Sequence, residues 1–138
     1  MKSSLFLDTS FTIAQVSTND QYNQKARLWS EKIQTENIPL VTTQAVLLEI
    51  GNALSRQRFR QIATSLLEYL TSSESIQIVP LSDGLFNKAF ELFRNRTDKE
   101  WGLVDCISFV VMTERSITEA LTADEHFNQA GFKALLLQ

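Results

Sequence analysis

The chain alternates short apolar runs with longer segments in which apolar residues recur at helical spacing, and this alternation limits the folds it can adopt. Short runs of this kind are typical of strands buried on both faces of a sheet. The runs are SLFLD at 4–8, IPLVT at 38–42, SIQIVP at 75–80, ITEALTA at 117–123 and FKALLL at 132–137. Strands that alternate with helices form βαβ units. The sequence therefore predicts an α/β fold with a mostly parallel sheet covered on both faces.

The segments between these runs carry the signals of helices. Thr42 or Thr43 is a suitable N-cap for one helix and Ser82 for another, while Gly131 closes the last helix as its C′ residue. The predicted helices lie at 19–35, 42–57, 59–71, 83–96, 102–115 and 124–131. A polar loop is expected at 95–101.

Length and composition narrow the class of protein. A chain of 138 residues, 43% of them apolar, fits a single domain spanning 1–138. Its one cysteine, Cys106, cannot form an intrachain disulfide, which fits a reducing cytoplasm. The apolar stretch before Asp8 is too short for a signal peptide, and no run reaches membrane-spanning length. The net charge of −3 argues against a plain nucleic-acid-binding module, unless some of the acids bind metal.

Acidic residues fall where a parallel sheet binds ligands. Asp8 follows the first apolar run and Asp124 follows the fourth, so both belong at the carboxyl edge of the sheet. Asp105 lies near the start of an apolar helix, and Glu49 lies inside another. Taken alone, Asp8 and Asp124 fit turns or N-caps, and Asp105 fits a favourable interaction with the helix dipole. Glu49 is different, because a carboxylate on an apolar helix face needs a cation or a hydrogen-bond donor.

A metal site accounts for all of these acids together. Carboxylates gathered without a cation would raise one another's pKa. Oxygen ligands without Cys or His favour hard ions, so the sequence predicts a Mg²⁺ (or Mn²⁺) site with catalytic ligands Asp8, Glu49, Asp105 and Asp124. Such ions assist in-line displacement at phosphorus. The predicted reaction is hydrolysis of a phosphodiester bond by a metal-bound water.

Three stretches, taken in order, resemble motifs of the PIN-domain ribonucleases, especially the VapC-type toxins of bacterial toxin–antitoxin pairs. FLDTSF at 6–11 resembles the opening strand with its metal-ligand Asp, here Asp8. TTQAVLLEIGNAL at 42–54 resembles the second motif, with Glu49 as its acid. DKEWGLVDCISFVVMTERSITEALTADEHFNQAGF at 98–132 resembles the block with the third and fourth acids, and the resemblance covers essentially the whole chain.

The resemblance implies a three-layer α/β/α PIN-like fold with a mostly parallel sheet of four or five strands. It implies a Mg²⁺- or Mn²⁺-dependent endoribonuclease acting on single-stranded or structured RNA, commonly a homodimer, and in toxin members an antitoxin protein whose segment occupies the active-site groove. Family members often carry hydroxyl residues before the third acid, in a pattern like WSLTD. Here Gly102 and Val104 take those places, which favours a reduced activity.

Two clusters of basic residues have alternative interpretations. One contains Arg56, Arg58 and Arg60. It fits either a solvated helix junction or phosphate contacts along an RNA groove. The other borders the predicted site and contains Arg94, Arg96 and Lys99. With Thr9, this second cluster is predicted to bind substrate.

Three further residues and three other functions have alternative interpretations. Trp101 fits a packing anchor better than a base-stacking platform, and Cys106 fits the core. His126 fits a structural role at a helix start better than assistance in proton transfer or phosphate binding. The competing functions are a non-toxic RNA-processing PIN nuclease and a catalytically weakened PIN domain that mainly binds a partner. A phospho-accepting receiver is disfavoured, because the first strand offers Asp8 alone and not an acid pair.

Overall fold

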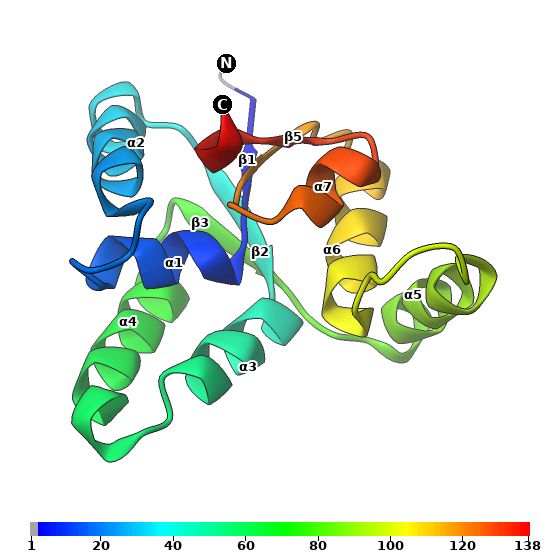
Figure 1. Cartoon of the computed structure of the whole chain (residues 1–138), viewed down its shortest axis with the longest axis horizontal. Coiled ribbons are helices and arrows are strands. Elements are labelled where there is room, and N and C mark those ends of the chain that lie inside the picture. Colours follow the sequence, from blue (N-terminus) through cyan, green and yellow to red (C-terminus); the bar gives the residue numbers. More distant parts are fainter. Residues whose placement is uncertain (1–2) are drawn as a thin grey trace.

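A five-stranded parallel sheet forms the centre of the molecule, which we describe from a computed structural model for residues 3–138 (Figure 1). The strands follow the order β3-β2-β1-β4-β5, and each neighbouring pair is parallel. Their bounds are β1 (Leu5–Leu7), β2 (Leu40–Thr43), β3 (Ile76–Val79), β4 (Glu119–Leu121) and β5 (Lys133–Ala134). The predicted α/β fold with a mostly parallel sheet of four or five strands is confirmed.

Helices lie on two sides of this sheet and complete the three layers. In Figure 1, α1, α2 and α4 lie to the left of the strands, and α5 and α6 lie to the right. The bounds are α1 (Thr9–Val16), α2 (Asn23–Glu36), α3 (Gln44–Ala53), α4 (Arg60–Ser72), α5 (Asp83–Asn95), α6 (Leu103–Glu114) and α7 (Glu125–Gln129). Among residues 3–138, we find no helix with the length and apolar character needed to cross a membrane.

Two predicted N-caps are present, and two predicted elements are shorter than expected. Thr43 accepts a hydrogen bond from the N–H of Val46, and Ser82 caps α5 in the same way. The helix predicted at 42–57 ends at Ala53. The strand predicted at 132–137 keeps only two residues, which pair with Glu119 and Ala120 of β4. The chain then continues as a 3₁₀ turn, in which the Leu136 N–H donates to the Thr122 carbonyl at 3.1 Å.

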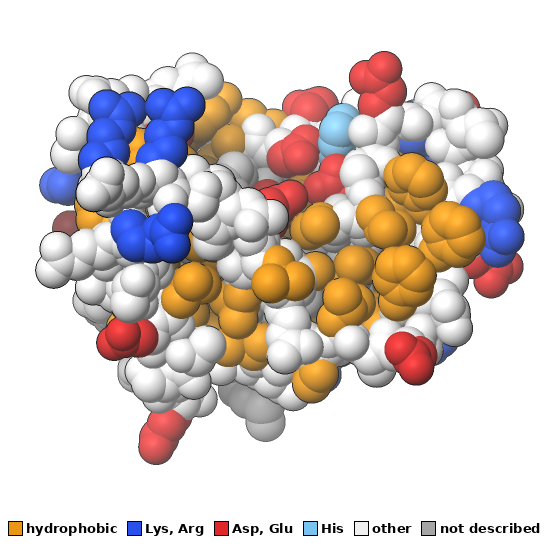
Figure 2. All heavy atoms as spheres, turned by 90° about the horizontal axis from the view of Figure 1, so that it is seen from below, with side chains coloured by type: hydrophobic (Ala, Val, Ile, Leu, Met, Phe, Trp, Pro, Cys, Tyr) orange, Lys and Arg blue, Asp and Glu red, His pale blue; other side chains and the backbone are white. Residues whose placement is uncertain are grey.

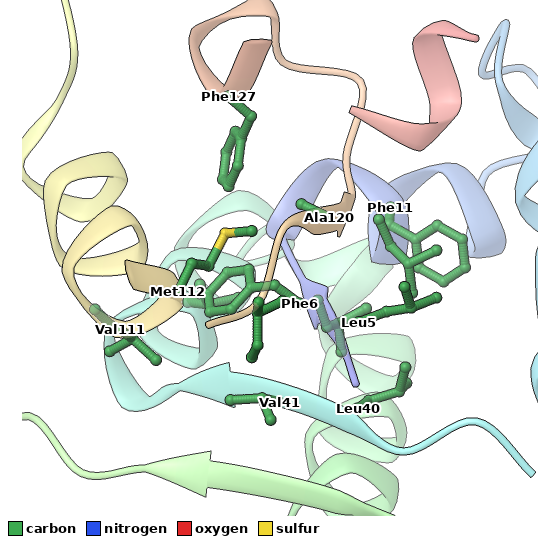
Figure 3. Close-up of a cluster of buried hydrophobic side chains, with 14 of the residues drawn as sticks. Leu5, Phe6, Phe11, Leu40, Val41, Val111, Met112, Ala120 and Phe127 are labelled. Carbon is green, nitrogen blue, oxygen red and sulfur yellow. The ribbon is translucent and has the colours of Figure 1, made fainter. Parts of the chain in front are cut away.

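The core explains why the first run is apolar without interruption. Successive side chains of a strand point to opposite faces, and both faces of β1 are covered. Figure 3 shows Phe6 directed toward Met112 of α6 and Phe127 of α7, while Leu5 lies near Phe11 of α1. Phe6, Met112 and Phe127 are fully buried. Packing on both sides therefore fixes β1, the strand that leads into Asp8.

The same packing fixes the elements that carry the other acids. Phe127 of α7 meets Phe109 of α6 edge-to-face, with ring centroids 5.0 Å apart. Trp101 packs on Phe109 in the same manner at 5.0 Å, is buried, and donates from Nε1 to Gln129 Oε1 at 3.0 Å. The structure thus makes Trp101 a packing anchor, and Cys106 is likewise buried in the core.

Candidate metal centre

Asp8 lies at the point where two central strands end together. The backbone N–H of Asp8 donates to the Leu121 carbonyl at 3.2 Å, which extends the pairing of β1 with β4 by one residue. Asp8 therefore lies beside Thr122, whose hydroxyl donates to Asp8 Oδ2 at 2.7 Å. Ser10 donates to the same oxygen at 3.2 Å. Asp8 occupies the N-cap position of α1, as one interpretation of the sequence expects, but its side chain makes no capping hydrogen bond.

Burial disfavours the charged form of Asp8 in the metal-free protein. Only 5% of the residue is exposed, and the pKa of Asp8 is raised from the ordinary 3.8 to about 6, chiefly by desolvation. The charges of Glu49 and Asp105 contribute to this rise, while the hydrogen bond from Thr122 opposes it. Asp8, which follows β1, therefore lies within the electrostatic range of the carboxylates of α3 and α6.

Glu49, an acid on an apolar helix, has a hydrogen-bond donor beside it. It is half-buried on α3 and accepts a short hydrogen bond from the hydroxyl of Thr9, the first residue of α1. This contact joins α3 to α1, the helix that follows Asp8. Thr9, predicted to bind substrate, holds Glu49 in place.

Asp105 and Asp124 meet around the single histidine of the chain. Asp105 Oδ2 accepts from the Gly102 N–H at 3.2 Å and lies 3.0 Å from His126 Nδ1. Asp124 caps α7 by accepting from the His126 N–H at 2.9 Å, and its Oδ1 lies 3.4 Å from His126 Nδ1. The N-cap interpretation of Asp124 is thus correct, and capping leaves this residue beside Asp105.

The pKa values of Asp105 and His126 are both shifted by their neighbours. Burial raises the pKa of Asp105, and the charge of Asp124 raises it further, whereas the hydrogen bond from His126 lowers it. The pKa of His126 is raised, chiefly by its hydrogen bond to Asp105 and then by the nearby charge of Asp124. His126 therefore lies within the acidic group, where its ring faces both carboxylates.

The residues present fit a divalent cation. Asp105, Asp124 and His126 each offer one ligand atom, and these atoms lie within 4.8 Å of one another. Within residues 3–138, neither Lys nor Arg forms an ion pair with these acids, with Asp8 or with Glu49. The cluster thus carries repulsion that a cation would relieve, and its carboxylate oxygens suit a hard ion.

The two basic clusters differ in how their charges are used. Arg96 makes a paired contact with Asp98, at 2.9 and 3.0 Å, and stacks over Trp101. Lys99 lies 3.9 Å from the same carboxylate, and Arg94 stacks over Phe90. The exposed residues of the other cluster have no carboxylate partner in the described part of the chain. They are Arg56, Arg58 and Arg60.

Figure 2 shows how charge is distributed on the face that carries the acids. Acidic side chains and the histidine gather at a hollow of this face. Lys and Arg side chains lie to one side, over the turn between α3 and α4, and hydrophobic side chains lie to the other, over α5. The acids are thus flanked by a basic surface and an apolar surface.

The raised pKa of Asp8 predicts a stability effect in the metal-free protein. The folded state binds a proton on Asp8 more tightly than the unfolded state does, so wild-type stability should rise as pH falls from about 7 toward 4. Asp8→Asn removes the buried charge and should raise the free energy of unfolding at pH 7.5 by up to about 3 kcal/mol. Urea unfolding in EDTA at pH 7.5 and pH 4 measures this. A variant that is less stable than wild type at pH 7.5 would contradict it.

An acidic cluster at the carboxyl edge of a parallel α/β sheet is the arrangement of a metal-dependent nuclease. The chain belongs to the PIN-domain family. The family model matches residues 5–133. The chain is 28% identical over 129 residues to VapC20 of Mycobacterium tuberculosis, a 23S rRNA-specific endonuclease, covering 93% of this chain and 95% of that protein. The predicted VapC-type PIN nuclease is confirmed.

Solved structures agree with this assignment. The crystal structure of M. tuberculosis VapC20, described as a sarcin–ricin loop cleaving toxin, matches with a TM-score of 0.81 at 26% identity, covering 94% of this chain and 96% of that one. FitAcB from Neisseria gonorrhoeae matches with a TM-score of 0.64 at 15% identity, covering 94% of each chain. At that identity the second likeness concerns the fold alone.

The sequence alone does not predict that the His126 ring faces both acids or that Thr122 donates to Asp8. His126 lies two residues after Asp124, and Thr122 lies two residues before it. The spacing T-x-D-x-H, across a strand end and the start of a helix, was the available signal.

Proposed function

We propose that this chain is a divalent-metal-dependent endoribonuclease of the toxin type that cleaves structured ribosomal RNA. The observation that carries the proposal is the grouping of one buried acid, Asp8, and three half-buried acids from separate segments around the strand ends. The ligands would be Asp8, Glu49, Asp105 and Asp124. The substrate class is supported by the relatives at 26–28% identity, which are described as acting on 23S rRNA and on its sarcin–ricin loop.

The residues of this chain would prepare the site in distinct ways. When bound, a divalent ion supplies Lewis acidity and lowers the pKa of water. Thr122 and Ser10 orient Asp8, and Thr9 orients Glu49, so both carboxylates are held before an ion or substrate arrives. The Gly102 N–H orients Asp105 in the same way. These contacts limit reorganisation during the reaction.

We propose that RNA phosphates approach over the α3–α4 turn. Arg56, Arg58 and Arg60 are exposed there without carboxylate partners in the described part of the chain, so no carboxylate neutralises their charge. Arg60 donates to the Ser55 carbonyl and Arg58 lies over the Phe59 ring. Arg94, Arg96 and Lys99 remain proposed substrate contacts, but Asp98 already neutralises part of their charge. Contact with RNA at the second cluster would require Arg96 to leave Asp98.

We propose a homodimer formed through α5. Phe86, Phe90 and Phe93 are 40%, 42% and 44% exposed, and the rings of Phe86 and Phe90 stack with centroids 6.2 Å apart. An exposed aromatic face of this kind marks an interaction surface. A second copy is the simplest occupant, because a two-fold axis lets the same face pack on itself.

We further propose an antitoxin partner and a cytoplasmic location. The toxin description of the VapC20 structure supports the first, and the free, buried Cys106 fits a reducing compartment. A short neighbouring gene for a DNA-binding protein would support the toxin over an RNA-processing nuclease.

A catalytically weakened PIN domain is the second candidate. It is favoured by Gly102 and Val104, which bring no hydroxyl to the start of α6. A Cβ built on Gly102 would lie 4.0 Å from Asp105 Oδ2, at ordinary contact distance, so the backbone there has room for a β-carbon.

One assay separates these proposals. Purified protein is incubated with end-labelled RNA containing the sarcin–ricin loop, in Mn²⁺, in Mg²⁺ and in EDTA. Endonucleolytic cleavage with the ions and none in EDTA is expected. Absence of cleavage in every condition would favour the weakened domain.

A further inference from the structure

His126 occupies a position where a ligand of the metal would lie. Its Nδ1 is 3.0 Å from Asp105 Oδ2 and 3.4 Å from Asp124 Oδ1, so one ring nitrogen faces both carboxylates. A divalent ion held at about 2.1 Å in octahedral geometry separates adjacent donor atoms by about 3.0 Å. The two distances from Nδ1 are therefore close to those between adjacent ligands on one ion, and the ligand atoms of the three residues all lie within 4.8 Å of one another.

The surroundings hold this ring in place. The backbone N–H of His126 donates to Asp124 Oδ1, which ties the residue to its neighbouring acid at the start of α7. The next residue, Phe127, is fully buried and packs on Phe6 and Phe109. The histidine side chain is 29% exposed, so an ion can reach it from solvent.

We propose that His126 is a direct ligand of the divalent ion through Nδ1, beside Asp105 and Asp124, and that this nitrogen makes the site select Mn²⁺ over Mg²⁺. The inference rests on the proposed function, because it concerns the ion that the site is proposed to hold. Mg²⁺ prefers oxygen ligands and retains its waters, whereas first-row transition ions accept imidazole nitrogen more readily. The alternative is that His126 only orients Asp105 by a hydrogen bond.

Isotope labelling tests the ligand assignment without a mutation. His126 is the only histidine in the chain, so protein made without a polyhistidine tag and grown on ¹⁴N- or ¹⁵N-histidine differs at this residue alone. Pulsed electron paramagnetic resonance of the Mn²⁺-loaded protein reports nitrogen bound to the ion. The expected result is a directly bound nitrogen coupling that changes with the isotope. Bound Mn²⁺ with identical spectra for both isotopes would overturn the proposal.

Calorimetry gives the second readout. His126→Gln should lower Mn²⁺ affinity at least about 10-fold and Mg²⁺ affinity much less. Glu125→Gln, an exposed neighbour on the same helix, is the matched control and should change neither; far-ultraviolet circular dichroism checks that both variants are folded. An equal loss for both ions would assign His126 an orienting role and overturn ligation.

The outcomes separate this inference from the proposed function. If the wild-type protein cleaves RNA with Mn²⁺ but shows no nitrogen coupling, only this inference fails. If the wild-type protein neither binds a divalent ion nor cleaves RNA, the proposed function fails as well.

Discussion

Asp8→Asn is expected to lower RNA cleavage at least about 10³-fold, the scale seen when one member of an interdependent catalytic set is removed. Asparagine keeps the shape of the side chain and can still accept from Thr122, whose hydroxyl lies 2.7 Å from Asp8 Oδ2. It removes the negative charge that a divalent ion needs at the end of β1. Single-turnover cleavage of end-labelled RNA in Mn²⁺ measures the loss.

The control for this variant is an acid outside the cluster. Asp83 is exposed at the start of α5, and Asp83→Asn should cleave RNA at the wild-type rate. Asp8→Asn should also be at least as stable as wild type in EDTA, so loss of activity would not reflect unfolding. Cleavage by Asp8→Asn within a few-fold of wild type would remove Asp8 from the mechanism.

Phe90→Asp should convert a dimer into a monomer. Phe90 lies in the middle of the exposed aromatic face of α5, between Phe86 and Phe93. A two-fold axis through this face would bring two introduced carboxylates into one apolar interface. Their desolvation and their mutual repulsion should weaken association at least about 100-fold. Sedimentation at micromolar concentration should change from twice the chain mass of 15.7 kDa to that mass alone.

A matched substitution elsewhere tests whether the effect is specific to α5. Leu28 on α2 is also apolar and is 59% exposed, so Leu28→Asp makes the same kind of change on another helix. This control should remain a dimer. A wild type that sediments as a monomer, or a Phe90→Asp variant that stays dimeric, would show that the aromatic face of α5 is not the interface.

The sheet and its acids could be predicted because both follow from local pattern. Short apolar runs separated by helical segments leave few arrangements other than a parallel sheet, and the ends of such strands collect ligands. Asp8 and Asp124 were therefore placed correctly from their positions after two runs. Glu49 stood out because an acid on an apolar helix face requires a partner, which the structure supplies as Thr9.

The remaining features depend on tertiary contacts that no local pattern contains. The ring of His126 faces Asp105 because α7 is rotated by the packing of Phe127 into the core, and that rotation is not encoded in the spacing of its neighbours. The pairing of Arg96 with Asp98 is equally a matter of loop geometry. The final strand is short because the chain turns into a 3₁₀ helix after Ala134, which the apolar run at 132–137 does not reveal.

The chemistry of the cut ends tests the central claim most directly. If the acidic cluster holds a divalent ion that promotes attack by water, cleavage leaves a 5′-phosphate and a 3′-hydroxyl, and it persists when the 2′-hydroxyl at the cut site is replaced by hydrogen. Mass spectrometry of products from wild-type protein in Mn²⁺ identifies the ends. A 2′,3′-cyclic phosphate, formed in EDTA as well as in Mn²⁺, would show that the 2′-hydroxyl is the nucleophile and would contradict the account.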